Sequence, residues 1–146
     1  MSDESELTEE EKKKAKNFID NLRHAGTVTE NLLNVLFEVV KGNKKPEDIS
    51  PIFLEWKESY KEVRALCTYI KTKHGTDKDF RLFSDIIKKG DELEKKINGL
   101  LIKNKKDIRG DILKITSSSF WRGGSVFSYY LGYIMALQKS LYDFIQ

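Results

Sequence analysis

The sequence has very few of the residues that mark disulfide-bonded, metal-binding or collagen-like proteins. Its 146 residues include one cysteine, two prolines, two histidines and nine glycines. The single cysteine, Cys67, excludes an internal disulfide and any zinc cluster made of cysteines. So few prolines and glycines exclude a collagen-like chain and a proline-rich disordered one. We expect Cys67 to be a buried apolar residue on a helix.

The chain also lacks a long apolar run. The longest weakly polar stretch, residues 125–137, has 13 residues, whereas a membrane-spanning helix needs roughly 20. The first eleven residues hold six acids, which is the opposite of the basic start of a secretory signal. The short apolar run predicts a protein that does not bind a membrane. Since the chain has only one thiol and no such signal, we predict that it is cytoplasmic.

Motifs for catalysis and cofactor binding are missing as well. The sequence contains neither HExxH nor a phosphate-binding or dinucleotide-binding glycine loop, and no serine in a G-x-S-x-G turn. A di-iron bundle needs glutamate three residues before histidine, but Asn21 and Lys71 precede His24 and His74. We therefore predict no metal ligands, no cofactor and no catalytic residues, and favour a protein that is not an enzyme.

Helical periodicity extends through nearly the whole chain. Apolar residues recur every three or four positions, and no useful stretch shows the alternation of a strand. Thr8 and Glu11 form a capping box, and Ser50 followed by Pro51 is typical of a helix start. We predict an all-α, single-domain bundle of about five helices over residues 9–146, after a flexible acidic N-terminus at residues 1–8.

Glycines set most of the predicted helix ends. Gly26 and Gly42 each stand where a left-handed residue commonly ends a helix. A later helix either continues to Ile108 or breaks at Gly90. Residues 107–115 form either a helical turn or a short extended piece. The predicted helices cover residues 8–26, 27–42, 50–75, 77–108 and 125–145.

The last 27 residues differ from the rest of the chain in charge. They hold eight of the sixteen aromatic residues but three charged ones, whereas the other 119 residues carry 46 charges. Small residues repeat there at every fourth position, which lets another helix approach closely. The helix is therefore either the central helix of the core or half of a contact with a partner. The small residues are Gly124, Ser128, Gly132, Ala136 and Ser140.

The segment before this helix combines aromatic residues, hydroxyls and one arginine. Phe120, Trp121 and Arg122 lie between three serines and two glycines. Tryptophan and arginine dominate the energetics of many interfaces, and hydroxyls at a helix N-terminus can bind an anion or a peptide. The alternative is that the two aromatic side chains fold back onto the bundle.

A basic excess precedes that segment. Residues 88–114 hold nine basic and five acidic side chains. Lys89, Lys96 and Lys103 fall at heptad spacing and so share one helix face. Such a stripe can follow a phosphate backbone. The alternative is an ordinary solvated face, because Glu92 lies within one turn of several of these lysines.

These features predict a non-enzymatic helical interaction module that works as an oligomeric accessory or regulatory subunit. Its partner would be another protein or a second copy of the chain in a homodimer. The alternative is an accessory protein that binds nucleic acid through the basic stripe. The predicted partner site comprises Phe120, Trp121, Arg122, Ser128, Gly132 and Ala136. The predicted nucleic-acid site comprises Lys89, Lys96, Lys103, Lys106 and Arg109.

Overall fold

The protein is an all-α helical bundle, as the sequence predicts. The computed structural model describes residues 8–74, 81–102, 108–116 and 126–145. Within these ranges five α-helices and one 3₁₀ helix form, and no strand. Their bounds are α1 Glu9–Lys41, η2 Pro46–Asp48, α2 Ile49–His74, α3 Arg81–Ile102, α4 Arg109–Thr116 and α5 Val126–Ile145.

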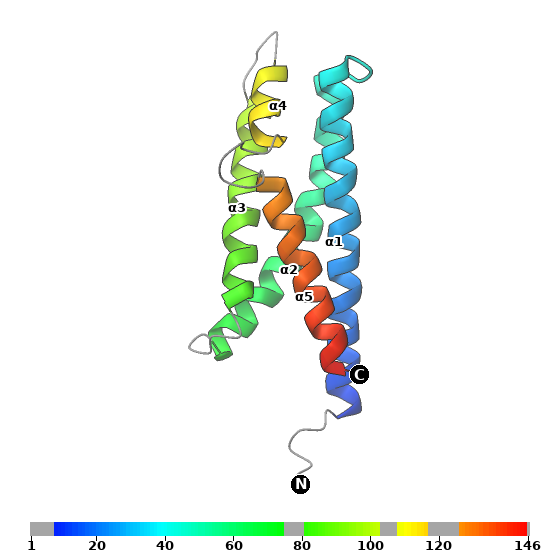
Figure 1. Ribbon diagram of the computed structural model, residues 1–146, viewed down its shortest axis with the longest axis vertical. Coiled ribbons are helices and arrows are strands. Elements are labelled where there is room, and N and C mark those ends of the chain that lie inside the picture. The colour runs from blue at the N-terminus through cyan, green and yellow to red at the C-terminus, as the bar shows by residue number, and fades with distance from the viewer. Residues whose placement is uncertain (1–7, 75–80, 103–107, 117–125, 146) are drawn as a thin grey trace.

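Four long helices lie side by side, and the short α4 lies at one end (Figure 1). α1 and α3 each contact both α2 and α5. α1 and α3 run in one direction along the bundle, and α2 and α5 run in the other (Figure 1). At 1.5 Å per residue, α1 is about 50 Å long and α5 only about 30 Å. α4 occupies the length that α5 leaves open, where it contacts α1, α3 and α5.

The two ends of α1 are capped as the sequence predicts. The Glu11 backbone N–H donates to the Thr8 hydroxyl oxygen at 3.0 Å, and the Thr8 N–H donates to the Glu11 carboxylate at 3.0 Å. At the other end Gly42 has φ of 84°, which a residue without a Cβ adopts at little cost. The N–H of Asn43 then reaches back to the Glu38 carbonyl at 2.9 Å.

The predicted helix end at Gly26 is wrong, because α1 continues through it without a break. A glycine inside a helix costs about 1 kcal/mol relative to alanine. The buried stripe of Leu22, Ala25 and Leu32 keeps its phase across this position, and its burial outweighs that cost. The Thr27 hydroxyl donates to the Arg23 carbonyl at 3.2 Å and does not start a new helix.

The other boundaries differ more modestly from the predicted ones. η2 leads directly into α2, so the helix begins just before the predicted Ser50–Pro51 start. α3 is continuous through Gly90 and Gly99 to Ile102, so of the two alternatives at Gly90 the continuous helix is the one that forms. The stretch over residues 107–115, left open between helix and extended chain, contributes the two-turn α4. The predicted fourth helix start at residues 76–77 lies outside the described residues.

Stacked aromatic rings form the middle of the core. Trp56 packs between Phe53 and Tyr60 on α2, with ring centroids 5.9 Å and 5.0 Å away. Tyr130 of α5 meets both Trp56 and Tyr60 edge-on at 5.7 Å. The Trp56 indole N–H donates to the buried Thr29 hydroxyl at 2.9 Å, which satisfies the indole and ties α2 to α1.

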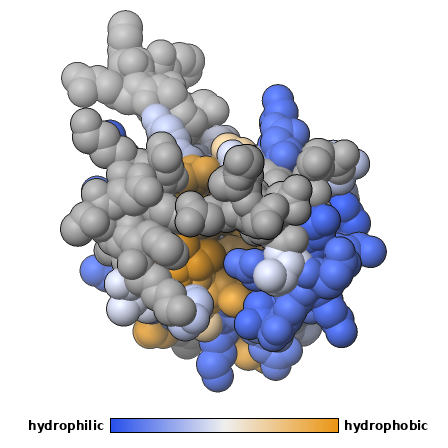
Figure 2. Space-filling view, turned by 90° about the horizontal axis from the view of Figure 1, so that it is seen from below, coloured by the Kyte–Doolittle hydropathy of each residue, from blue (hydrophilic) through white to orange (hydrophobic). Residues whose placement is uncertain are grey.

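Apolar side chains extend from this middle layer to the end of the bundle where α1 begins. Viewed from that end, hydrophobic residues occupy the centre and hydrophilic residues gather along one side (Figure 2). Phe18 of α1 and Phe83 of α3 are both buried and their ring centroids lie 6.4 Å apart. This contact links α1 and α3 across the bundle.

Candidate functional site

α5 buries only one side against the bundle. Its buried residues lie on the side that packs against α1 and α3, the helices with which it makes most of its contacts. The helix is therefore not the fully enclosed central helix that one of the two sequence interpretations required. The buried residues described on α5 are Val126, Phe127, Tyr130, Ile134 and Leu137.

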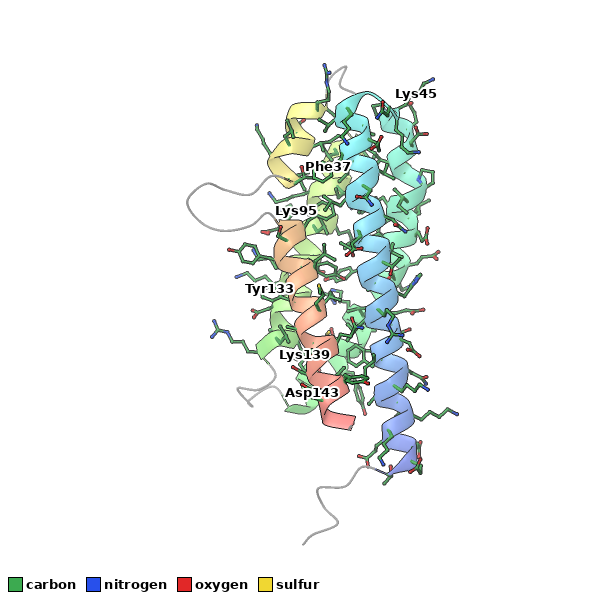
Figure 3. The ribbon with its side chains drawn as sticks, turned by 45° about the vertical axis from the view of Figure 1, so that its right-hand side comes forward. Phe37, Lys45, Lys95, Tyr133, Lys139 and Asp143 are labelled. Atoms are coloured by element: carbon green, nitrogen blue, oxygen red, sulfur yellow. The ribbon has the colours of Figure 1, made fainter. Side chains whose placement is uncertain are left out.

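The opposite side of α5, which we call the outward face, carries the small residues that the sequence analysis singled out. Ser128, Gly132, Ala136 and Ser140 are all exposed. Met135 beside them is 63% exposed. Lys139 and Asp143 are the only charged residues among the 20 of α5, and both are labelled in Figure 3. The structure thus presents three of the predicted partner residues together on one accessible surface.

Gly132 lies in open space on the outward face. A Cβ added to Gly132 would meet no atom of the chain within 4 Å. The glycine is therefore not needed for packing within the monomer. By contrast, the outward side of α2 exposes charged residues such as Glu55, Lys61 and Glu62. The outward face of α5 differs from that surface because its side chains are small and mostly uncharged.

A groove runs along the edge of the outward face, between α5 and α1. Ile19 and Arg23 of α1 form one wall, and Met135, Gln138, Lys139 and Tyr142 form the other. Tyr142 is 53% exposed. The groove thus combines apolar side chains with two cations, Arg23 and Lys139. It adjoins the line of small residues and extends the candidate contact surface from α5 onto α1.

Several predicted site residues lie outside the part of the chain that the structure describes. These are Phe120, Trp121 and Arg122 of the aromatic segment, and Lys103 and Lys106 of the basic stripe. Their assignments remain predictions.

The three described residues of the predicted nucleic-acid site differ in their surroundings. The Lys89 ammonium lies 3.4 Å from the Glu92 carboxylate and 5.1 Å from the centroid of the Tyr129 ring. Lys89 is therefore engaged within the chain, and its side chain is only 25% exposed. Lys96 and Arg109 are exposed. The three side chains thus do not form one uniform row of solvated cations.

Lys96 lines a cleft of about 550 Å³ between α3 and α4. Lys95 and Lys114 also line it, together with Glu92 and Asp111. Leu100 and Ile115 supply apolar surface, and Gly99 lies on its wall. Lys114 and Lys95 were not among the predicted site residues, because no sequence pattern indicates that α4 folds back against α3.

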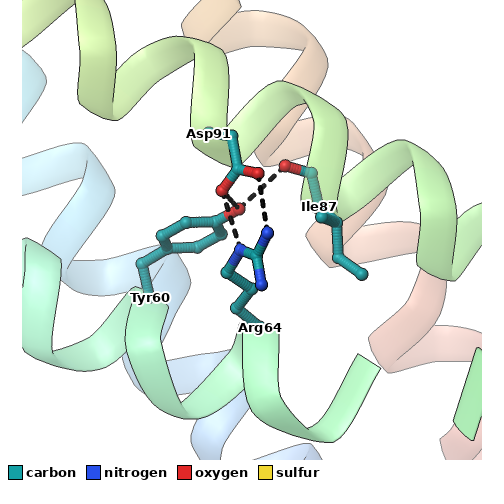
Figure 4. Close-up of polar contacts among 4 residues, drawn as sticks. All are labelled: Tyr60, Arg64, Ile87 and Asp91. Carbon is teal, nitrogen blue, oxygen red and sulfur yellow. Dashed lines mark hydrogen bonds and ion pairs between the residues drawn. The ribbon is translucent and has the colours of Figure 1, made fainter. Parts of the chain in front are cut away.

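A polar cluster joins α2 to α3 (Figure 4). Two guanidinium nitrogens of Arg64 donate to the Asp91 carboxylate at 2.9 Å and 3.0 Å. The Tyr60 hydroxyl lies 2.7 Å from Asp91 Oδ1 and 2.8 Å from the Ile87 carbonyl oxygen, so these acceptors share its single proton. The bond from Arg64 lowers the pKa of Asp91, and burial raises that of Tyr60. Asp91 is therefore ionised and Tyr60 neutral at neutral pH. We call Tyr60, Arg64 and Asp91 the clamp, because they hold α2 against α3.

The remaining reactive groups that the structure describes are shielded. Cys67 is fully buried, as the sequence predicts, and burial raises the pKa of its thiol to about 12. Burial also raises the pKa of the Tyr130 hydroxyl, which has no hydrogen-bond partner in the described part of the chain. Among the described residues, no three or more histidine, cysteine or acidic side chains are grouped so as to hold a metal ion.

None of the described helices combines the length and apolar character needed to cross a bilayer. No family model matches the chain, and no curated protein or solved structure does either. Function must therefore be inferred from the surfaces described above.

Proposed function

We propose that the protein is a helical interaction module that pairs with a second copy of itself through the outward face of α5. The observation that carries this proposal is the exposed line of small residues around Gly132 on a helix with only two charges. Charged residues are depleted at the centre of protein interfaces. Small residues let two helix backbones approach closely, so that many atoms come into contact.

The energetics of Gly132 support the same proposal. An exposed glycine within a helix costs about 1 kcal/mol relative to alanine. Gly132 makes no close contact within the chain that would offset this cost. Close contact with a partner helix at this position would offset it.

The charge distribution favours a second copy over a charged partner. Lys139 and Asp143 cancel, so the outward face has no net charge. In an antiparallel contact centred between Gly132 and Ala136, the two copies of Lys139 would lie about 15 Å apart. That separation exceeds the screening length of about 8 Å at physiological salt. Two copies therefore meet without like-charge repulsion.

The size of the surface predicts a reversible dimer. A face about 30 Å long and 10 Å wide offers roughly 300 Å², whereas a standard interface buries about 800 Å² on each partner. The contact must therefore include the groove between α5 and α1, lined by Arg23 and Met135 among others. We also place the dimer in the cytoplasm, because the lone thiol is buried and unpaired with another cysteine.

Replacement of Gly132 by leucine tests this proposal. The substitution favours the helix and fills open space in the monomer, but it blocks close approach of a second helix. In sedimentation velocity we expect the wild-type chain to form a dimer at tens of micromolar. Gly132→Leu should raise the dimer dissociation constant by at least tenfold while its circular dichroism stays helical.

The matched control is Gly99→Leu. Gly99 is also within a helix and also has nothing within 4 Å of an added Cβ, but it belongs to α3. This variant should dimerise like the wild type. A wild-type chain that remains monomeric at millimolar concentration would refute the proposed homodimer, and so would equal loss of dimer in both variants.

A further inference from the structure

We infer that the cleft between α3 and α4 binds a small phosphorylated molecule of the nucleoside diphosphate class. This inference is independent of the proposed dimer, because the described residues that line the cleft belong to α3 and α4 and not to α5. Its volume of about 550 Å³ lies within the range of ordinary ligand pockets, about 300 to 1,000 Å³.

The charges around the cleft favour an anion. Lys95 and Lys96 of α3 and Lys114 of α4 line it, and none of the three is paired with an acid in the described part of the chain. Of the two acids in the cleft, Glu92 is already 3.4 Å from the ammonium of Lys89. The cleft is therefore lined by three lysines and two acids, one of which is already engaged by a lysine outside the cleft.

The apolar residues of the cleft favour an organic phosphate over a bare inorganic ion. Leu100 and Ile115 are only 4% and 7% exposed and form the inner surface. Gly99 leaves room on the wall, since an added Cβ would meet no atom within 4 Å. In a ligand with phosphates at one end and an apolar ring at the other, the phosphates would pair with the lysines and the ring would cover this apolar surface.

The same geometry disfavours an extended nucleic-acid backbone as the ligand. A phosphate backbone needs cations spread along a continuous track. Along α3 toward its N-terminus, the next predicted member of the stripe, Lys89, is engaged with Glu92 and Tyr129. The unpaired lysines instead converge on one cleft from two helices, which suits a compact ligand.

Isothermal titration calorimetry with ADP, pyrophosphate, adenosine and a mixed single-stranded DNA 20-mer tests this inference. At low salt we expect ADP to bind with one-to-one stoichiometry, pyrophosphate more weakly, and adenosine not measurably. Lys96→Gln and Lys114→Gln should each raise the dissociation constant for ADP by about tenfold, the loss expected for one hydrogen bond to a charged group. Gly99→Leu should abolish binding because it fills the cleft.

Two variants serve as controls. Lys61→Gln removes an exposed lysine on α2 and Gly132→Leu fills open space on α5, so neither should change the affinity for ADP. The inference is overturned if ADP does not bind at millimolar concentration. It is equally overturned if Lys61→Gln weakens binding as much as Lys96→Gln does, or if the 20-mer binds and ADP does not compete with it.

Discussion

Tyr60 is the residue that holds three helices in register. Its ring stacks on Trp56 of its own helix, meets Tyr130 of α5 edge-on, and its hydroxyl reaches Asp91 and the Ile87 carbonyl of α3. Two neighbouring turns of α3 therefore accept from one buried side chain of α2. The aromatic spacing in the sequence predicts that Tyr60 is buried, but nothing in the sequence indicates that Asp91, 31 residues away, would be its partner.

The lowered pKa of Asp91 leads us to expect that the stability of the fold depends on pH at low pH. Its folded-state pKa is lowered, chiefly by the hydrogen bond from Arg64, relative to about 3.9 in an unfolded chain. The clamp therefore stabilises the fold above that pH, and this contribution is lost as the pH falls through the lower folded-state pKa. Because both partners are nearly half exposed, we expect a contribution of no more than about 1 kcal/mol.

Urea unfolding of Asp91→Asn checks this prediction. The variant should be less stable than the wild type near pH 7. The difference should shrink as the pH falls below about 4, where the carboxylate takes up a proton in the unfolded wild-type chain before it does so in the folded one. Glu62→Gln, which removes an exposed carboxylate of α2, should show no such convergence. A difference for Asp91→Asn that stays constant down to about pH 2 would show that the clamp does not titrate as described.

At the scale of helices, burial of a continuous apolar stripe keeps a helix going past a glycine that locally favours a helix end. Gly26 and Gly90 both carry a local signal for a helix end, yet α1 and α3 pass through them. Sequence reasoning located the helices well, because heptad-like spacing of apolar residues reports directly on burial. It was wrong at Gly26 and left Gly90 open, because the energy of a whole packed stripe is not visible at one position.

The orientation of α5 was not predictable from the sequence for a different reason. Apolar residues surround most of its circumference, and the small residues give opposite signals, because glycine and alanine are often buried whereas serine is mostly exposed. Which side is buried depends on the large rings that pack against α1 and α3, namely Phe127 and Tyr130. The candidate residues Ser128, Gly132 and Ala136 could be chosen from their spacing, but their exposure could not.

The close contact between α2 and α3 at Gly90 allows a prediction about stability. A Cβ added there would collide with the Tyr60 ring, which neighbouring aromatic rings and hydrogen bonds hold in place. We expect Gly90→Ala to lose about 1–3 kcal/mol of unfolding free energy by overpacking, although alanine is the better helix former.

The matched variant is Gly99→Ala on the same helix, where the added Cβ meets no atom. It should gain about 0.5–1 kcal/mol. Urea unfolding of the two variants at neutral pH makes the comparison. If Gly90→Ala were as stable as Gly99→Ala, then the Tyr60 ring would not be fixed against α3 as the structure shows.

For the whole molecule, the surface divides into regions of different character. The outward side of α2 is charged, the cleft between α3 and α4 gathers unpaired lysines, and the outward face of α5 is nearly uncharged. The segregation of charge along the sequence anticipates this division. The cleft itself was not predictable, because it exists only where α4 packs against the end of α3.

The central proposal concerns where two copies meet, and a site-specific cross-link measures that most directly. Ala136→Cys places an exposed thiol on the outward face of α5, while Lys61→Cys places one on α2. The native Cys67 is buried and its thiol pKa is raised to about 12, so it should not react. With a short bis-maleimide reagent at tens of micromolar protein, we predict covalent dimers from Ala136→Cys, fewer when Gly132→Leu is added, and few from Lys61→Cys. Equal yields from the two cysteine positions would contradict an interface on α5.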